Sequence, residues 1–411
     1  MDIQTKKKIL KKYIELNGGV LRLVPSWVTR TFLPPGRRLK LDSRDLYPRG
    51  VSQGAVSERW MSSTGMCDNG STTGPFEGMS FIACKTADGI EKILLKDAID
   101  LLGDEILGSE VMKERGGLTS FAKFYDFAQP IHNHVHLMKK EAALVAAPPK
   151  PEAYYFPTEL NTFDYNAGYT YFGIDPHISK KEFKKYLENW DKGDNNILEV
   201  SRAYKLKMGT GWDIPAGILH APGAVVTYEP QYMSDTSLFM QNINHDVFTE
   251  HEMLVKFVPE DKKTDLEFIV DCLDWEANTD LDFKHNHYHE PIPVADVNEM
   301  AENGYYEEWI VYGSDEFCAK RLTVFPGYTI TIHDGAAYGF IMMQGVGQIN
   351  ELPIETPSVI RYEQLTCDEY FVTKTAADKG VKISNTSDNS NVVMLKHFGP
   401  GNAESGKFLK K

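Results

Sequence analysis

The sequence predicts a mainly β protein with two β-barrel, jelly-roll-like domains and helical inserts. Short runs of alternating apolar and polar residues, separated by Gly, Pro and Asn turns, fill residues 121–232 and again 305–399. Between them, residues 245–274 carry apolar side chains at helical spacing. The repeated strand–helix alternation that a parallel α/β sheet requires does not occur. Because a closed barrel has no exposed strand edge, two barrels suit this chain.

The N-terminal part, residues 1–115, is expected to be a β and helical segment packed on the first barrel. An amphipathic first helix ends at Gly18. Residues 54–90 alternate as antiparallel strands do, and a short helix over 96–102 is expected to end at Gly103.

The remaining chain divides into three expected parts. The first barrel covers residues 116–244, and the capping box formed by Ser179 and Glu182 predicts a helix inserted between its strands. A helical linker follows over residues 245–303. A second barrel completes the chain over residues 304–411.

Composition excludes several classes of function. The 411 residues carry a formal net charge of -14 with no basic run to offset it, which argues against binding nucleic acid. No window has the apolar length of a membrane span or of a signal peptide core. Five scattered cysteines indicate reduced thiols, so we expect a cytoplasmic protein without membrane contact. Homo-oligomers are compatible with the sequence.

Histidines form the most informative pattern. His132, His134 and His136 alternate, and alternate residues of a β-strand share one face. Together with His220 and a carboxylate, such imidazoles make a site for a borderline divalent ion. The second barrel has no paired imidazoles, because its histidines are His333 and His397, so we expect it to lack metal.

Two carboxylates compete to complete the metal site. Glu141 follows Lys140 in a charged run that suits a solvated surface. Glu152 opens an apolar strand over 153–156 that suits a barrel wall. We favour Glu152, although Glu141 stays an alternative.

Two stretches resemble the cupin motifs. Four residues match the second cupin motif at every position: Gly209, Pro215, Gly217 and His220. The core of the first motif is matched, without its flanking glycines, by His134, His136 and Glu141.

Within the cupins, the chain resembles class I mannose-6-phosphate isomerases over roughly residues 20–240. The segments that carry this resemblance are 57–62, 121–126, 150–152, 214–221 and 234–236, together with Glu229 and Gln231. The resemblance implies a role in carbohydrate metabolism, namely metal-dependent aldose–ketose isomerisation of a sugar or sugar phosphate through an enediol. It implies Zn²⁺, or another divalent ion such as Mn²⁺ or Fe²⁺, held by His134, His136, Glu152 and His220.

The isomerisation also requires a base that carries a proton between adjacent carbons. The candidates are Lys123, Glu229, His132 and Lys150. Lys123 matches the family's lysine on the strand before the metal histidines, and desolvation is expected to lower its pKa. A salt-bridged lysine in the barrel wall is the competing interpretation.

The chain departs from the family at two positions. The family's Gln-x-His ligand pair is replaced here by His134 and His136. Phe239 stands where the family has an arginine, and an apolar ring cannot stabilise an enediolate. We therefore expect low activity on mannose 6-phosphate or a different sugar. Arg202 is a candidate for bidentate phosphate binding, or a surface residue.

Two other functions fit parts of the pattern. A non-catalytic sugar-binding cupin would explain the missing arginine, and an iron cupin dioxygenase would use a similar ligand set. A second histidine-rich stretch over 285–289 is interpreted as a linker, since no second motif follows it.

Overall fold

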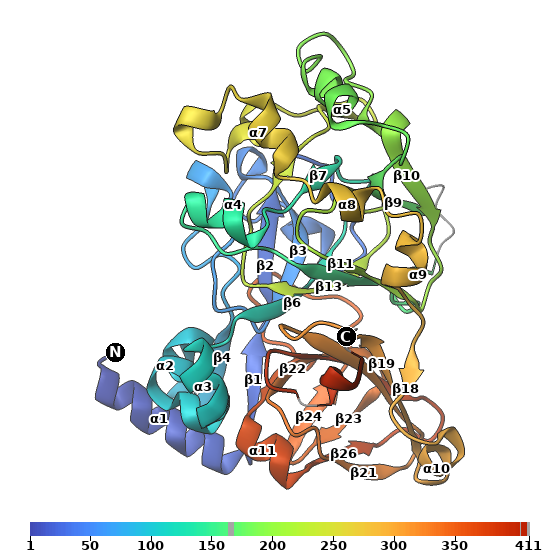
Figure 1. The fold of residues 1–411 in the computed structure, drawn as a ribbon. Helices are drawn as coiled ribbons and strands as arrows, with labels where there is room; N and C mark the ends of the chain where they lie inside the picture. Colours follow the sequence, from blue (N-terminus) through green and yellow to red (C-terminus); the bar gives the residue numbers. More distant parts are fainter. Residues whose placement is uncertain (163–167, 403, 409–411) are drawn as a thin grey trace.

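The computed structural model describes residues 1–162, 168–402 and 404–408. The fold is mainly β, as predicted, and all pairings between its strands are antiparallel. Two barrels lie one above the other in Figure 1. No helix in the described part of the chain is both long and apolar enough to span a bilayer.

The first barrel is made from two sheets. One has the strand order β17 (Tyr288–His289), β11 (Gly211–Ile214), β8 (Glu152–Tyr155), β13 (Thr227–Tyr232), β6 (Ser120–Tyr125), β3 (Ala55–Met61) and β2 (Ser26–Arg30). The other has the order β10 (Ser201–Lys205), β9 (Tyr169–Ile174), β12 (His220–Ala221), β7 (His134–Val135) and β14 (Leu238–Phe239). A hairpin of β15 (Ile243–Asn244) and β16 (Val247–Phe248) follows.

The second barrel also has two sheets. The larger runs β18 (Ile292–Pro293), β19 (Tyr305–Val311), β20 (Cys318–Val324), β27 (Val392–Phe398), β22 (Tyr338–Gln344), β25 (Glu369–Val372), β1 (Val20–Val24), β4 (Phe81–Thr86) and β5 (Gly89–Leu94). The smaller runs β21 (Thr329–Ile332), β26 (Val381–Asn385), β23 (Val346–Ile349) and β24 (Leu352–Glu355).

The N-terminal segment divides between the barrels, although it was expected to pack on the first alone. Strands β2 and β3 join the first barrel, whereas β1, β4 and β5 extend a sheet of the second. Pro25 separates β1 from β2, and a residue without an N–H cannot continue a strand ladder, so the chain changes sheets there. The expected domain boundaries otherwise stay predictions.

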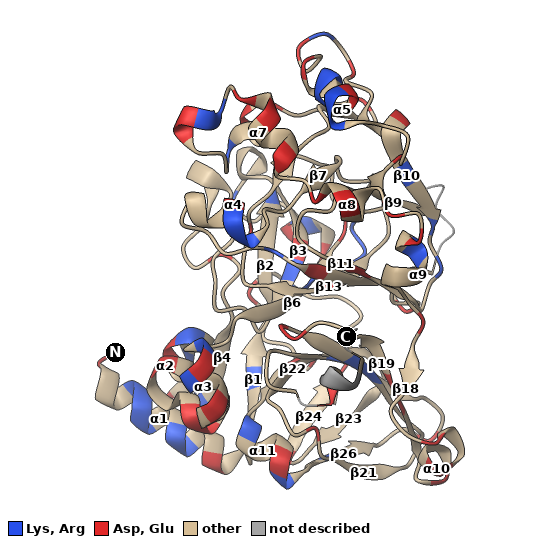
Figure 2. Cartoon of the chain, viewed as in Figure 1, with Lys and Arg blue, Asp and Glu red and all other residues tan. Residues whose placement is uncertain are grey.

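Helices cover the outer faces. Helices α1 (Ile3–Leu16), α2 (Leu95–Ile106) and α3 (Ser109–Arg115) lie beside the second barrel in Figure 1, and Figure 2 shows both signs of charge along them. Helix α2 continues to Ile106, but it is kinked at Leu102, which has a non-helical φ of −140° and ψ of 30° directly before Gly103. The other helices are α4 (Lys139–Leu144), α5 (Lys180–Leu187), α6 (Glu252–Val255), α7 (Leu266–Asp271), α8 (Trp275–Asn278), α9 (Phe283–His287), α10 (Val297–Glu302) and α11 (Lys374–Lys379).

Two local predictions are confirmed. The inserted helix α5 begins with the expected capping box of Ser179 and Glu182. All five cysteines are free thiols, and all except Cys367 are buried. The helical pattern over 245–274, in contrast, is realised only as short helices, because Pro259 and the cap residue Asp265 interrupt it.

Candidate metal centre and its cavity

Strand pairing brings three histidines together inside the first barrel. His134 of β7 and His220 of β12 are direct cross-strand partners, and their ring centroids are 4.1 Å apart. His136 follows β7, with its ring 5.0 Å from that of His134. One nitrogen of each ring lies within 4.8 Å of the others, and all three rings are buried. These histidines form a group that could hold a metal ion.

The turn before His220 needs its glycine. Gly217 has a φ of +92°, a conformation that L side chains rarely adopt, and a Cβ there would meet Met138 and Asp274 within 3.0 Å. Its N–H donates to the carbonyl of His136 at 2.8 Å, so a backbone hydrogen bond links the segment that contains His136 to the one that contains His220.

The ring orientations are set by backbone carbonyls. Each Nδ1 lies 2.7 or 2.8 Å from a carbonyl oxygen: His134 with that of His132, His136 with that of Thr236, and His220 with that of Ile218. A carbonyl only accepts, so each Nδ1 carries the hydrogen and each Nε2 keeps its lone pair. Burial lowers the pKa of His134 and brings that of His136 to about 3, so both rings are neutral.

Glu152 on β8 faces this group of nitrogens. Its two oxygens lie 3.0 Å from His136 Nε2 and 3.1 Å from His220 Nε2. The buried Nε2 of His220 makes no hydrogen bond despite that distance, so its lone pair is free. Burial alone raises the pKa of Glu152, but Lys150 and His136 outweigh it and hold the pKa well below its usual range. The donor set of three imidazole nitrogens and one carboxylate therefore fits a divalent cation.

Glu141 is not brought to this group. It lies on α4, with Lys140 at 3.9 Å, and among the described residues it does not belong to the histidine group. Glu152, in contrast, lies 3.0 Å from His136 and 3.1 Å from His220, and its role as the fourth ligand stays a prediction.

His132 turns away from the other histidines, although it alternates with them in sequence. Strand β7 contains only His134 and Val135, so the period-two geometry does not extend back to His132. Its Nε2 donates to the carbonyl of Val247 at 3.0 Å, and its ring stacks on Phe239 at 5.7 Å. A direct contact of His132 with a ligand in the cavity is therefore not supported.

The other candidate bases form a buried cluster beside Glu152. Lys123 and Glu229 are cross-strand partners on β6 and β13, with Nζ and Oε1 3.2 Å apart. Lys150 lies 3.7 Å from Glu229, 2.7 Å from Glu152 and 2.9 Å from His136 Nε2. Burial and then the charge of Glu152 raise the pKa of Glu229 to about 8.

The pKa of Lys123 shifts in the direction opposite to that expected. Burial alone lowers it, but the nearby carboxylates of Glu229 and Glu58 outweigh burial and raise the pKa above its ordinary value. The resting amine is therefore protonated, because its neighbours compensate the cost of desolvation.

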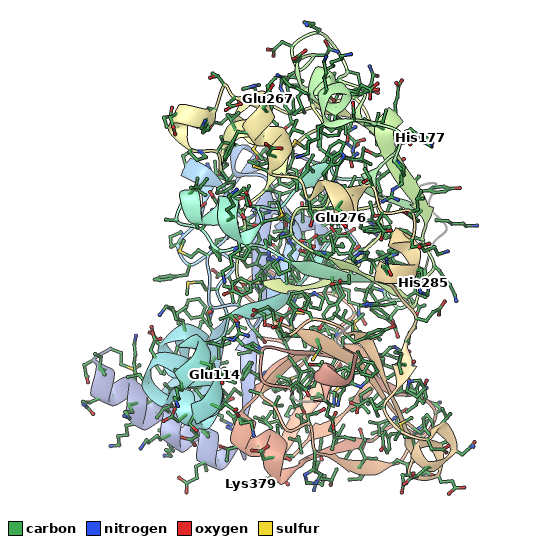
Figure 3. The ribbon with its side chains drawn as sticks, in the orientation of Figure 1. Glu114, His177, Glu267, Glu276, His285 and Lys379 are labelled. Atoms are coloured by element: carbon green, nitrogen blue, oxygen red, sulfur yellow. The ribbon has the colours of Figure 1, made fainter. Side chains whose placement is uncertain are left out.

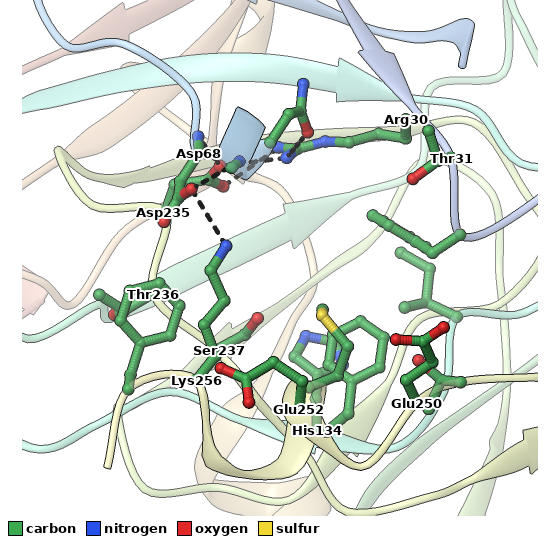
Figure 4. A pocket seen from close by; sticks show the side chains of 18 of the residues that line it. Arg30, Thr31, Asp68, His134, Asp235, Thr236, Ser237, Glu250, Glu252 and Lys256 are labelled. Carbon is green, nitrogen blue, oxygen red and sulfur yellow. Dashed lines mark hydrogen bonds and ion pairs between the residues drawn. The ribbon is translucent and has the colours of Figure 1, made fainter. Parts of the chain in front are cut away.

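A cavity of about 640 Å³ opens onto His134 and His136, and Figure 4 shows it from close by. The polar residues of its lining include Arg30, Glu58, Asp68, Asn69, Asp235 and Lys256. The apolar residues of its lining are Phe32, Ile131, Phe239, Phe248, Met253 and Phe257. Lys123 and Lys150 also line the cavity. A mainly concave site with a few placed polar groups is typical of small-molecule binding.

Several residues in and around the site were not predicted from the sequence. Tyr154, which donates to Glu152 at 2.7 Å, could have been found, because it lies two residues along the same strand face. Arg30 and Lys256 have no local signal, because Arg30 precedes His134 by 104 residues and Lys256 follows His220 by 36.

Arg202 and the second histidine stretch lie elsewhere. The guanidinium of Arg202 donates to the carbonyls of Asn278 and Asp280 and stacks on Phe283, so it is not presented to the cavity. His287 pairs with Asp213 at 3.4 Å, and His285 lies at the edge of the molecule in Figure 3. Among the described residues, the 285–289 stretch belongs to no group that could hold a metal ion.

The fold and site define a double-barrel protein with a candidate metal centre in one barrel. No family model and no curated protein sequence matches the chain. Solved structures of isomerases do match its fold, and the resemblance found in the sequence is confirmed at that level. A putative mannosephosphate isomerase from Archaeoglobus fulgidus is 14% identical, with 93% of this chain and 98% of that chain covered and a TM-score of 0.58. A mannose 6-phosphate isomerase bound with zinc and yttrium is 13% identical, with 93% and 100% covered and a TM-score of 0.62. The Bacillus subtilis mannose 6-phosphate isomerase is 15% identical, with 92% and 99% covered and a TM-score of 0.60.

Proposed function

We propose that this protein is a metal-dependent isomerase that interconverts an aldose and a ketose. One observation carries the proposal: three imidazole nitrogens and the Glu152 carboxylate converge where a cavity of about 640 Å³ meets the Lys123–Glu229 pair. Similarity of fold to mannose 6-phosphate isomerases supports it but does not select the reaction by itself.

His134, His136, Glu152 and His220 would hold the ion. Zinc suits this set, and manganese or iron would also be accepted by it. When bound, the ion supplies a Lewis acid for the sugar's carbonyl and hydroxyl oxygens. In the structure, the Lys150 ammonium lies 2.9 Å from Nε2 of His136, the nitrogen that would bind the ion. This ammonium must therefore move away when the ion binds.

Proton transfer is assigned to Lys123 and Glu229. Lys123 lines the cavity, and Glu229 lies behind it at 3.2 Å. Above a pH of about 8 Glu229 is ionised and can accept a proton from Lys123, whose neutral amine would then take a proton from one sugar carbon and return it to the next. The intermediate would be an enediol, and the ammonium group of Lys150 would offset its developing negative charge.

The test is a panel of sugars in D₂O with metal-loaded protein. Mannose 6-phosphate, fructose 6-phosphate, mannose, fructose and lyxose are each incubated and analysed for the isomeric product and for deuterium at carbon. We expect at least one substrate to give both, and chelated protein to give neither. Consumption of oxygen during the reaction would instead indicate a dioxygenase and contradict the proposal. Tight sugar binding without turnover would instead favour a binding protein, which the loss of the arginine at Phe239 also suits.

A further inference from the structure

We infer that the cavity takes an unphosphorylated sugar, because the cations along its described walls are already engaged by carboxylates. The inference deepens the proposed function and rests on it for the reaction, but it can be tested by binding alone. Four cations line the cavity, against five carboxylates. A phosphoryl group would add close to two further negative charges.

Arg30 has no donor left for a phosphate. Its guanidinium has five N–H groups. Nε and Nη2 donate to the two oxygens of Glu58, at 2.7 and 3.1 Å. Nη1 and Nη2 donate to the two oxygens of Asp235, both at 3.1 Å, and Nη1 also donates to Asn69 at 2.9 Å. Figure 4 shows Arg30 directed at Asp235.

The two deeper lysines are also engaged. Lys123 lies 3.2 Å from Glu229 and 3.9 Å from Glu58. Lys150 lies 2.7 Å from Glu152. Removing Lys123 from its carboxylates would leave a buried charge unpaired, which is strongly unfavourable. Lys150 must move from His136 when a metal ion binds, but it also has Glu229 at 3.7 Å as a partner.

Lys256 is the cation nearest the mouth of the cavity. It lies 3.0 Å from Asp68, and both side chains are partly exposed. Figure 4 shows the ammonium of Lys256 directed at Asp68, with Glu252 near the base of the Lys256 side chain and Glu250 farther to the right. A phosphate dianion at Lys256 would have to displace Asp68 among these carboxylates, so this position repels the group that it would need to bind.

The apolar residues of the lining also favour an unphosphorylated sugar. Phe239 is buried, with its ring 5.6 Å from that of His134 and 5.8 Å from that of Phe32. The same lining contains five carboxylates, which are hydrogen-bond acceptors. A neutral sugar fits such a lining, because it can turn C–H groups to the aromatic rings and hydroxyl groups to the carboxylates.

The first test compares mannose with mannose 6-phosphate on one preparation of metal-loaded protein, by kcat/KM and by calorimetric binding. We expect mannose to be favoured by about tenfold or more in both measurements, a difference of about 1.4 kcal/mol or more. We also expect millimolar inorganic phosphate not to inhibit. Preference for the 6-phosphate, or no binding of either sugar, would overturn the inference. If neither sugar is isomerised but mannose binds more tightly, the proposed reaction fails and the inference holds.

Two variants sharpen this test. Phe239→Arg introduces a cation without a carboxylate partner and should shift the preference toward the 6-phosphate by about tenfold, whereas the matched Phe239→Leu should not. Lys256→Met provides a second test of the inference if Phe239→Arg does not fold. Its control is Lys85→Met, because Lys85 is an exposed lysine of β4. The preference for mannose should persist in Lys256→Met. A loss of 6-phosphate binding confined to Lys256→Met would show that Lys256 binds the phosphate, and the inference would be wrong.

Discussion

The two barrels share an antiparallel architecture, but they bury their polar groups for different purposes. In the first barrel, three Nε2 lone pairs converge beside a cavity, and that of His220 makes no hydrogen bond. In the second, Lys396 pairs with Asp334 at 2.8 Å and with Glu307, so its charge is compensated. The first barrel thus presents potential metal-ligand atoms, whereas the second barrel pairs its buried charges with one another.

A second lysine completes the charge cluster of the second barrel. Lys320 lies 3.0 Å from Asp334, 3.6 Å from Glu307 and 4.7 Å from the ring centroid of Trp309. Breaking a fully compensated buried ion pair costs stability, because one charge stays buried without a partner. The comparison therefore predicts that mutations in the first barrel remove function and those in the second remove stability.

The largest expected effect is in the first barrel. The double variant His136→Ala, His220→Ala should lose about one equivalent of metal and reduce activity by about a thousandfold or more, because two ligands disappear. Elemental analysis of protein purified without chelators measures the metal. His177→Ala is the matched control, since that ring is exposed and lies at the periphery in Figure 3. Metal retained by the double variant would refute the site.

The next effect belongs to the second barrel. Lys396→Met should lower the free energy of unfolding by about 3–5 kcal/mol, because Asp334 and Glu307 lose a buried partner. Denaturant unfolding measures this, with Lys382→Met on the exposed face of β26 as control. Metal content should not change. A variant as stable as the wild type would show that the cluster does not depend on this lysine.

A smaller effect separates proton transfer from metal binding. Glu229→Gln keeps the size of the side chain but cannot accept a proton from Lys123, so we expect kcat to fall by about a hundredfold. Metal content and melting temperature, measured on the same preparation, should stay close to those of the wild type. Full activity in this variant would remove Glu229 from the mechanism.

The smallest effect concerns the junction of the two barrels. Glu369 of β25 pairs with Arg59 of β3 at 2.9 Å, and burial raises the pKa of Glu369 to about 7. Because the folded pKa exceeds the unfolded one, the folded state binds more protons between about pH 4.5 and 7, and its stability falls as pH rises through that range. Glu369→Gln should remove this contribution, about 2–3 kcal/mol between pH 4.5 and 8. The free energy of unfolding is measured for both proteins at both pH values. The same change with pH in the wild type and in Glu369→Gln would contradict the assignment.

Short-range patterns determined much of this protein. The mainly β class, the capping box of α5 and the shared position of His134 and His136 all follow from residues a few positions apart. Such spacings fix which side chains share a face, so they can be recognised without knowing the partners. Gly217 belongs to the same group, since its turn needs a positive φ.

Only the tertiary structure decided which groups meet. The pairing of β6 with β13 sets Glu229 against Lys123 and raises the lysine pKa, where desolvation alone predicted the opposite. The folding of the chain also turns His132 toward Val247 and carries Glu141 onto α4. These outcomes depend on contacts between residues far apart in the chain. The charge and solvation of a buried group are set by such neighbours, and local periodicity carries no information about them.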